Sequence, residues 1–160
     1  MNLEYPIYVQ SRVQCGPASL RGLFKHLKGI DYGETYLSFL TGANKEGCGP
    51  EEMERAAKEL GFFVLNISEG GTLPMLERLT KEKLFPLVCY TDMFYEDEHW
   101  ATVLSVDSSV IIADTKALGI REIPKKEFYD WWTLKEGGKT LNTTLIITPD
   151  EQVFVQRMAD

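Results

Sequence analysis

The apolar positions of the first sixty residues recur at the spacing of α-helices. Leu20, Leu23 and Leu27 lie three or four residues apart, which places them on one face of a helix that begins near Pro17 and ends at Gly29. The same kind of pattern predicts two further helices, over residues 34–40 and 50–60. The first part of the chain is therefore expected to be helical.

The remainder of the chain alternates short apolar runs with turn residues, which is typical of strands. Strands are predicted over residues 62–68, 85–91, 100–105, 110–114 and 140–148. The third and fourth of these are close enough to form a β-hairpin. Further helices are predicted over residues 72–82 and 126–132. Helices first and antiparallel strands later describe an α+β domain.

Composition and charge narrow the class of protein. The 160 residues are expected to form one domain, residues 1–160, because 44% are hydrophobic and 26% charged, as in soluble globular proteins. The net charge of −7 argues against nucleic acid as a partner. No apolar stretch approaches the roughly 18 residues of a membrane span, and the start lacks the pattern of a signal peptide. A cytoplasmic protein with no membrane span in this chain is therefore expected.

The three cysteines lack a Cys-x-x-Cys pair and predict neither a disulfide framework nor a zinc site. Cys15 and Cys48 each stand in Cys-Gly-Pro at the start of a predicted helix, and Cys89 lies in a predicted strand. A helix start stabilises a thiolate at Cys15, whereas Glu51 and Glu52 oppose one at Cys48. Burial should make Cys89 inert. Cys15 is therefore the candidate nucleophile, and the other two are expected to be structural.

A cysteine nucleophile needs a base, and the chain has two histidines. His26 lies off the apolar face of its helix and is expected to face solvent. His99, directly before the strand 100–105, is the candidate base. Two amide side chains ahead of the cysteine, Gln10 and Gln14, could each donate a hydrogen bond to an oxyanion.

The imidazole also needs an orienting acceptor, and Asp114 at the end of the hairpin is the candidate. A two-residue hairpin turn would leave His99 about 13 Å along the strand from Asp114, too far for contact. A four-residue loop over residues 105–108 would place the two directly opposite each other, as a bulge could also do. The four-residue loop is the prediction. Asp107 is the weaker alternative, and the remaining nearby acids, Asp92, Glu96, Asp97 and Glu98, are expected to form a solvated rim.

The order of these segments resembles that of papain-like cysteine peptidases. The stretches VQCGPASL, GCGPEEMERAAKELGF, FPLVCYT, HWATVLSV, VIIADT and IPKKEFYDWW are similar to the bacteriocin-processing, double-glycine leader peptidase family. Its members usually form the cytosolic front end of ABC exporters. The resemblance runs over roughly residues 8–132. It implies a papain-like fold, in which N-terminal helices are followed by an antiparallel β-sheet.

The resemblance also implies a role for each candidate residue. Cys15 corresponds to the nucleophile, His99 to the general base and Asp114 to its orienter. The family's oxyanion glutamine lies six residues before the cysteine, whereas Gln10 lies five before it, so Gln10 takes this role with Gln14 as the alternative. The implied activity is peptide-bond hydrolysis through a thioester at Gly-Gly-like sites, without metal or cofactor. The implied partners are a peptide or protein substrate and an exporter.

Other functions are compatible with the same residues. A catalytically silent module would bind a peptide or leader without cutting it, although such relatives would be expected to lose the cysteine or the histidine. An acyl transferase would keep the triad and replace water with an amine or thiol, a choice that pocket shape decides. A metal site of Cys15, His99 and Asp114 fits a helix-start cysteine less well. Self-processing is disfavoured because the chain's Gly-Gly pairs predict turns, and with Cys15 this near the first residue no N-terminal inhibitory propeptide is expected.

Overall fold

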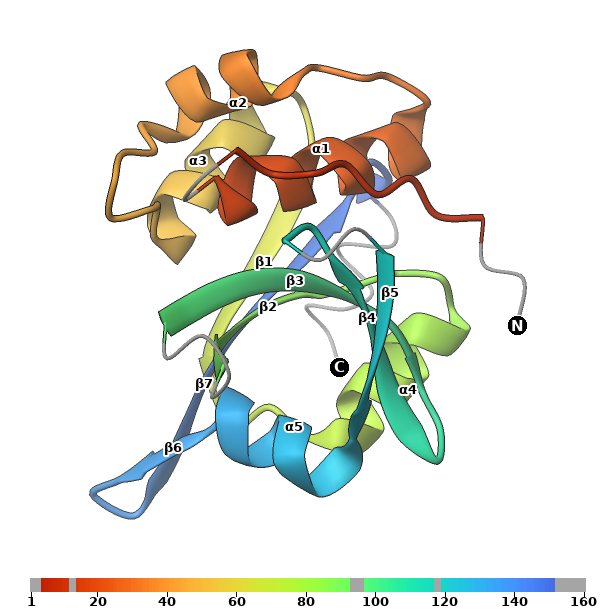
Figure 1. Cartoon of the computed structure of the whole chain (residues 1–160), viewed down its shortest axis with the longest axis vertical. Coiled ribbons are helices and arrows are strands. Elements are labelled where there is room, and N and C mark those ends of the chain that lie inside the picture. The colour runs from red at the N-terminus through yellow and green to blue at the C-terminus, as the bar shows by residue number, and fades with distance from the viewer. Residues whose placement is uncertain (1–3, 12–13, 93–96, 117–118, 152–160) are drawn as a thin grey trace.

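Three helices gather at one end of the computed structural model, which describes residues 4–11, 14–92, 97–116 and 119–151 (Figure 1). They are α1 (Cys15–Lys28), α2 (Glu34–Thr41) and α3 (Pro50–Glu59). The first two end at glycines in the left-handed conformation, Gly29 with φ of 72° and Gly42 with φ of 68°. Residues with a side chain rarely adopt this conformation, so both stops are set by the sequence. All three helices predicted for this part of the chain are confirmed.

An antiparallel sheet forms the rest of the framework. Its strands are β1 (Phe63–Glu69), β2 (Leu87–Asp92), β3 (Asp97–Val106), β4 (Ser109–Asp114), β5 (Gly119–Pro124), β6 (Leu134–Glu136) and β7 (Lys139–Thr148). They are arranged in the order β1-β7-β2-β3-β4-β5, and β6 pairs with β7. β7 therefore lies inside the sheet, between β1 and β2.

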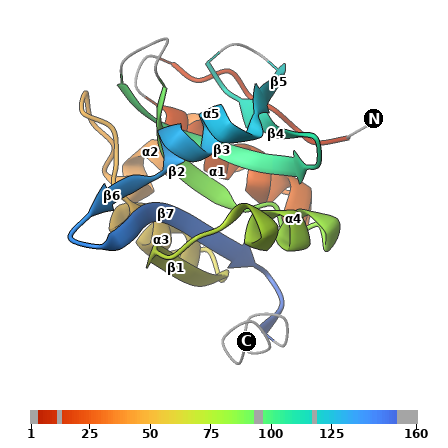
Figure 2. The ribbon, with the colours of Figure 1, turned by 90° about the horizontal axis from the view of Figure 1, so that it is seen from below.

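The sheet separates two hydrophobic cores. Alternate residues of one strand point to opposite faces, so Leu87 packs with α1–α3 in one core while Val88 packs in the other. The second core is closed by α4 (Leu73–Lys81) and α5 (Lys125–Trp132). Figure 2 shows α4 and α5 on the near side of the sheet, with α1–α3 behind it. The α+β architecture predicted from the sequence is confirmed.

Two short strands are absent from the prediction. β5 reads Gly-Ile-Arg-Glu-Ile-Pro and lies at the edge of the sheet, so only one side of it is paired, and Ile120, Glu122 and Pro124 are exposed. β6 has three exposed residues. Neither has the apolar run that marks a buried strand. Within the described residues, each helix falls short of the length and apolar character that crossing a bilayer requires.

The register of the β3–β4 hairpin differs from the predicted four-residue loop. Val106 lies opposite Val110, so three residues make the turn, and Thr102 lies opposite Ala113 because the register shifts at a bulge between Val103 and Ser105. The predicted loop length is wrong, and the bulge supplies the shift instead. Asp114 consequently falls level with Ala101, two residues from His99.

Candidate active site

Cys15 is the first residue of α1 and is partly buried where this helix meets β3. Burial alone would raise the pKa of its thiol. The hydrogen bond with His99, the backbone N–H of Trp100, the positive charge of His99 and the backbone N–H of Gly16 outweigh burial and lower that pKa. The helix start contributes in the same direction, since its unpaired N–H groups favour an anion. These contacts favour the thiolate form of Cys15.

His99 lies on β3 opposite Tyr90 and is only 4% exposed. Burial alone would lower the pKa of its ring, but the contact with Asp114 and the bond and charge of Cys15 raise it to about 9. Its Nε2 atom lies 3.6 Å from Oδ1 of Asp114, which leaves Nδ1 as the atom for Cys15. The opposed pKa shifts of Cys15 and His99 favour a negative charge on the thiol and a positive charge on the ring.

Asp114 ends β4 and is 1% exposed. Residues on neighbouring strands that are two positions out of register share a face, within reach of side chains of this length. His99 and Asp114 meet in this diagonal relation. The backbone N–H of Lys116 donates to Oδ1 at 2.8 Å, and Arg121 Nη1 lies 3.7 Å from Oδ2. These contacts favour a charged carboxylate beside the imidazole.

The two glutamines are held in different places. Gln10 pairs with Thr115, directly after Asp114: its backbone N–H donates to the Thr115 carbonyl at 3.0 Å, and its Oε1 accepts from the Thr115 hydroxyl at 2.8 Å. Gln14 precedes α1, and its Oε1 accepts from the hydroxyl of Ser38 on α2. The structure therefore brings Gln10 to the same end of the sheet as Asp114 and directs Gln14 toward the helices.

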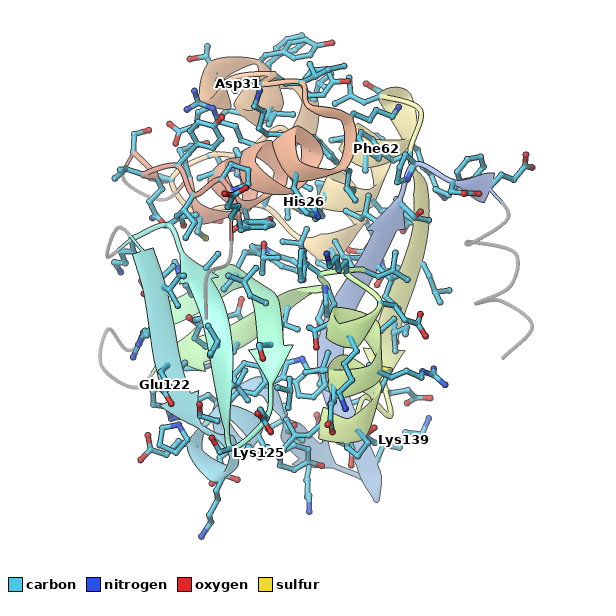
Figure 3. All side chains as sticks on the ribbon, turned by 90° about the vertical axis from the view of Figure 1, so that its right-hand side faces the viewer. His26, Asp31, Phe62, Glu122, Lys125 and Lys139 are labelled. Carbon is cyan, nitrogen blue, oxygen red and sulfur yellow. The ribbon has the colours of Figure 1, made fainter. Side chains whose placement is uncertain are left out.

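The other titratable candidates lie apart from this site. His26 is not solvent-facing as predicted: its ring packs between Tyr5 and Phe85 at centroid distances of 5.4 and 5.0 Å. Figure 3 shows it on the side of α1 toward the sheet. Asp107 lies in the hairpin turn at the far end of β3 from His99. The structure therefore brings His99 and Asp114 together and places these two residues away from them.

Of the acids predicted to form a solvated rim, Asp97 and Glu98 are exposed. Asp97 lies 3.4 Å from Lys116 Nζ. The Asp92 side chain and Glu96 lie outside the described residues.

Cys15 opens into a hollow of ≈220 Å³. Its lining comes from α1, the loop before α3, and strands β2, β3 and β7: Cys15, Glu46, Gly47, Cys48, Gly49, Pro50, Cys89, Glu98, Trp100 and Thr143. A second hollow of ≈400 Å³ shares Cys89, Glu98 and Thr143 with the first and extends to Trp131 and Leu134. Glu98, predicted to be only a solvated rim residue, therefore borders both.

Cys48 and Cys89 differ from Cys15 in their titration. Burial raises the pKa of each thiol to about 12, helped at Cys48 by the charges of Cys15 and Glu52 and at Cys89 by that of Glu98. All three cysteines are free thiols. Among the described residues, no three His, Cys, Asp or Glu side chains are grouped to hold a metal ion, which gives the metal-site alternative no support.

A sequence model of a protein family, described as the peptidase C39 family, matches residues 4–136 of this chain. The peptidase domain of Streptococcus ComA, described as a bi-functional ABC transporter involved in a quorum sensing pathway, has a TM-score of 0.69 at 22% identity, covering 91% of this chain and 98% of that one. No curated protein matches the chain.

Two further solved structures share the fold. One is a double glycine motif protease from an AMS/PCAT transporter in complex with the leader peptide, with a TM-score of 0.69 at 17% identity over 92% of this chain and 93% of that one. The other is the peptidase domain of Streptococcus mutans ComA, with a TM-score of 0.60 at 21% identity over 92% of this chain and 100% of that one. These likenesses confirm the papain-like fold.

Proposed function

Because this chain belongs to the peptidase C39 family and is a cysteine peptidase, we propose that it hydrolyses peptide bonds through Cys15, His99 and Asp114. The observation that carries the proposal is the hydrogen bond between Cys15 and His99 at the start of α1, with the pKa of the thiol lowered and that of the imidazole raised. Cys15 acts as the nucleophile, His99 as general acid and base, and Asp114 as the acceptor that orients the ring.

In the first half of the reaction, the Cys15 thiolate attacks the carbonyl carbon of the scissile bond. The carbonyl oxygen becomes an oxyanion, to which the Cys15 backbone N–H and the Gln10 amide donate. Each donor of this kind contributes about 3–4 kcal/mol. The His99 imidazolium then gives its proton to the leaving nitrogen, the C–N bond breaks, and the acyl group remains on Cys15 as a thioester.

In the second half, neutral His99 takes a proton from water, and the hydroxide attacks the thioester. The C–S bond breaks, the product leaves with a new carboxylate, and Cys15 returns to the thiolate. Asp114 stays ionised throughout and stabilises the imidazolium each time it forms. The contacts of Asp114 with Lys116 and Arg121 support that role.

The substrate is inferred to carry small residues, such as Gly-Gly, before the cut. The similar double glycine motif protease was solved with a leader peptide. By the same likeness, residues 1–160 form a single peptidase domain that works in the cytoplasm beside an exporter.

A catalytically silent module is the weaker candidate, because binding a peptide has no need of a buried cysteine and histidine with opposed pKa shifts. An acyl transferase would share every step up to the thioester. The two enzymes differ only in the acceptor, water or an amine, and the product distinguishes them.

The first test is alkylation with iodoacetamide between about pH 4 and pH 9, followed by peptide mapping of the three cysteines. We expect Cys15 to label fast at acidic pH, and Cys48 and Cys89 to label slowly. His99→Ala should abolish the fast acidic labelling, and the matched variant His26→Ala should keep it. Equal labelling of all three thiols, rising only above about pH 8, would contradict the proposal.

The second test is cleavage of a peptide that contains Gly-Gly, beside a matched peptide that carries Val-Val at the same place. Hydrolysis yields a product with a free carboxylate, whereas an acyl transferase would incorporate an added amino acid amide in preference to water. Binding without any product would favour the silent module. Mass spectrometry of the products separates the three outcomes.

A further inference from the structure

All three cysteines of the chain line the hollow into which Cys15 opens. Peptide hydrolysis uses Cys15 alone, so the mechanism leaves Cys48 and Cys89 without a role. Cys48 is partly exposed in this hollow rather than sealed in a core. Because the Cys48 thiol borders the reactive sulfur of Cys15, a role for it in the chemistry of Cys15 has to be considered.

The sulfur of Cys48 packs directly on the first turn of α1. It lies 2.5 Å from the position that a Cβ on Gly16 would occupy. Since adjacent Cα atoms are about 3.8 Å apart and a Cα–Cβ bond is about 1.5 Å, this sulfur is within about 8 Å of the Cys15 Cα. Trp100 joins the two residues, because its Nε1–H donates to the Cys48 carbonyl at 3.0 Å and its backbone N–H donates to Cys15.

Cys48 also has the backbone freedom that Cys89 lacks. It lies outside every helix and strand, between Gly47, with φ of 90°, and Gly49. Cys89 lies inside the sheet, opposite Trp100 on one side and Thr143 on the other. A disulfide requires Cα atoms within about 7 Å and a defined geometry. The glycine-flanked loop can adjust toward that geometry, and the paired strand cannot.

We propose that Cys48 is the resolving thiol for peroxide oxidation of Cys15, so that the two form a reversible disulfide that protects the nucleophile. Hydrogen peroxide or another hydroperoxide is the oxidant. The Cys15 thiolate attacks one peroxide oxygen, the O–O bond breaks, and a proton converts the departing hydroxide to water. The sulfur loses two electrons and becomes a sulfenic acid.

In the second step, the Cys48 sulfur attacks the Cys15 sulfur, and the S–O bond breaks. The Cys48 proton leaves with the hydroxyl group as a second water molecule, and the S–S bond forms. A dithiol such as dithiothreitol returns both cysteines to thiols. Without a resolving thiol, a sulfenic acid is open to further, irreversible oxidation to the sulfinic acid.

The environment of Cys48 orders these steps. Burial first, and then the negative charge of Cys15, raise the pKa of Cys48 to about 12, which keeps it unreactive while Cys15 is a thiolate. Oxidation of Cys15 to the neutral sulfenic acid removes that charge. One cause of the raised pKa is then gone, while burial, the largest cause, remains.

The test treats the whole chain with a small excess of hydrogen peroxide, followed by digestion without reductant. The expected product is a Cys15–Cys48 linked peptide, and dithiothreitol should recover most of the fast acidic alkylation of Cys15. In Cys48→Ser, Cys15 should gain two oxygens and recover little. Cys89→Ser is the matched control and should behave as the unaltered chain. Retained fast labelling of Cys15 in both variants before oxidation shows that each is folded.

A Cys15–Cys89 bridge, no bridge in the unaltered chain, or equal recovery of unaltered and Cys48→Ser protein would each overturn the proposal. It rests on the proposed function only in taking Cys15 as the reactive thiol. The experiment measures the masses of the digested peptides and not the rate of peptide cleavage. If peroxide forms the Cys15–Cys48 bridge but the reduced protein does not cleave peptide, the result counts against the peptidase reaction alone. If the reduced protein cleaves peptide but peroxide forms no bridge, the result counts against this inference alone.

Discussion

Asp114 and Cys15 keep His99 protonated, because their contacts and charges outweigh burial and raise the pKa of the ring to about 9. A ring with a raised pKa holds its proton below that value and loses it above. Since imidazolium protonates the leaving nitrogen, kcat/KM should fall as pH rises through about 9. In Asp114→Asn the pKa of His99 falls, so this decline should begin at lower pH. The rate should drop by roughly 10²–10⁴.

The pH profile of kcat/KM on a cleaved peptide measures both effects. Asp107→Asn is the matched control, because Asp107 sits in the hairpin turn away from His99, and its profile should be unaltered. A slower Asp114→Asn enzyme with the same alkaline decline would show that Asp114 does not set the charge of His99.

Gln10 and Gln14 can be separated by a pair of substitutions. Gln10→Ala should lower kcat by about 10²–10³, the usual cost of one oxyanion donor, with little change in KM. Gln14→Ala should change kcat only slightly, because its side chain is engaged with Ser38 on α2. Initial rates at saturating peptide give the comparison. The reverse ranking would transfer the oxyanion role to Gln14.

The sequence singled out Cys15 and His99 as candidates because few thiols and imidazoles compete for these roles and one cysteine begins a helix without nearby acids. It missed the packing of His26 between Tyr5 and Phe85, since Tyr5 comes from a segment without periodicity. It also missed Glu98 at the border of both hollows. A single sequence does not distinguish an exposed acid that borders a cleft from one that faces open solvent.

The first turn of α1 requires a glycine at position 16, because Gly16 lies against Cys48 and Met53 with no space for a Cβ. A Cβ at this position would meet Cys48 Sγ at 2.5 Å and Met53 Sδ at 2.9 Å. Gly16→Ala should therefore destabilise the fold by about 1–3 kcal/mol, as overpacking does. Adding Cys48→Ala should return part of that loss, since it removes one of the two clashing atoms. Urea unfolding of both single variants and the double variant measures this coupling, and purely additive losses would contradict it.

The β3–β4 hairpin shows where the sequence could not predict geometry. Both strands were placed correctly, but the bulge between Val103 and Ser105 leaves no mark in the alternation of a fully buried strand. Residues 99–104 are all buried, so a shift of one residue moves no polar side chain into the core. The face shared by His99 and Asp114 follows from this bulge and not from loop length.

The place of β7 in the sheet ties the end of the described chain to its middle. β7 pairs with β1 on one side and β2 on the other, and Leu145 and Ile147 fill the core under α1–α3. Strand order of this kind depends on long-range pairing, which the sequence pattern does not reveal. The family match ends at residue 136, three residues before β7 begins.

A chain truncated after Glu136 should therefore fail to fold, although it contains every residue proposed for catalysis. Burial of Leu145, Ile146 and Ile147, each 5% exposed or less, contributes about 1.5–3 kcal/mol per side chain, and two sheet edges would lose their partner. Natural domains have only about 5–15 kcal/mol to lose. Truncation after Glu151 keeps every described strand and serves as the control, with a cooperative unfolding transition near that of the whole chain. Circular dichroism during urea unfolding, together with acidic labelling of Cys15, distinguishes the two. A cooperative transition in the shorter chain would show that the helices and β1–β5 form a fold that does not need β7.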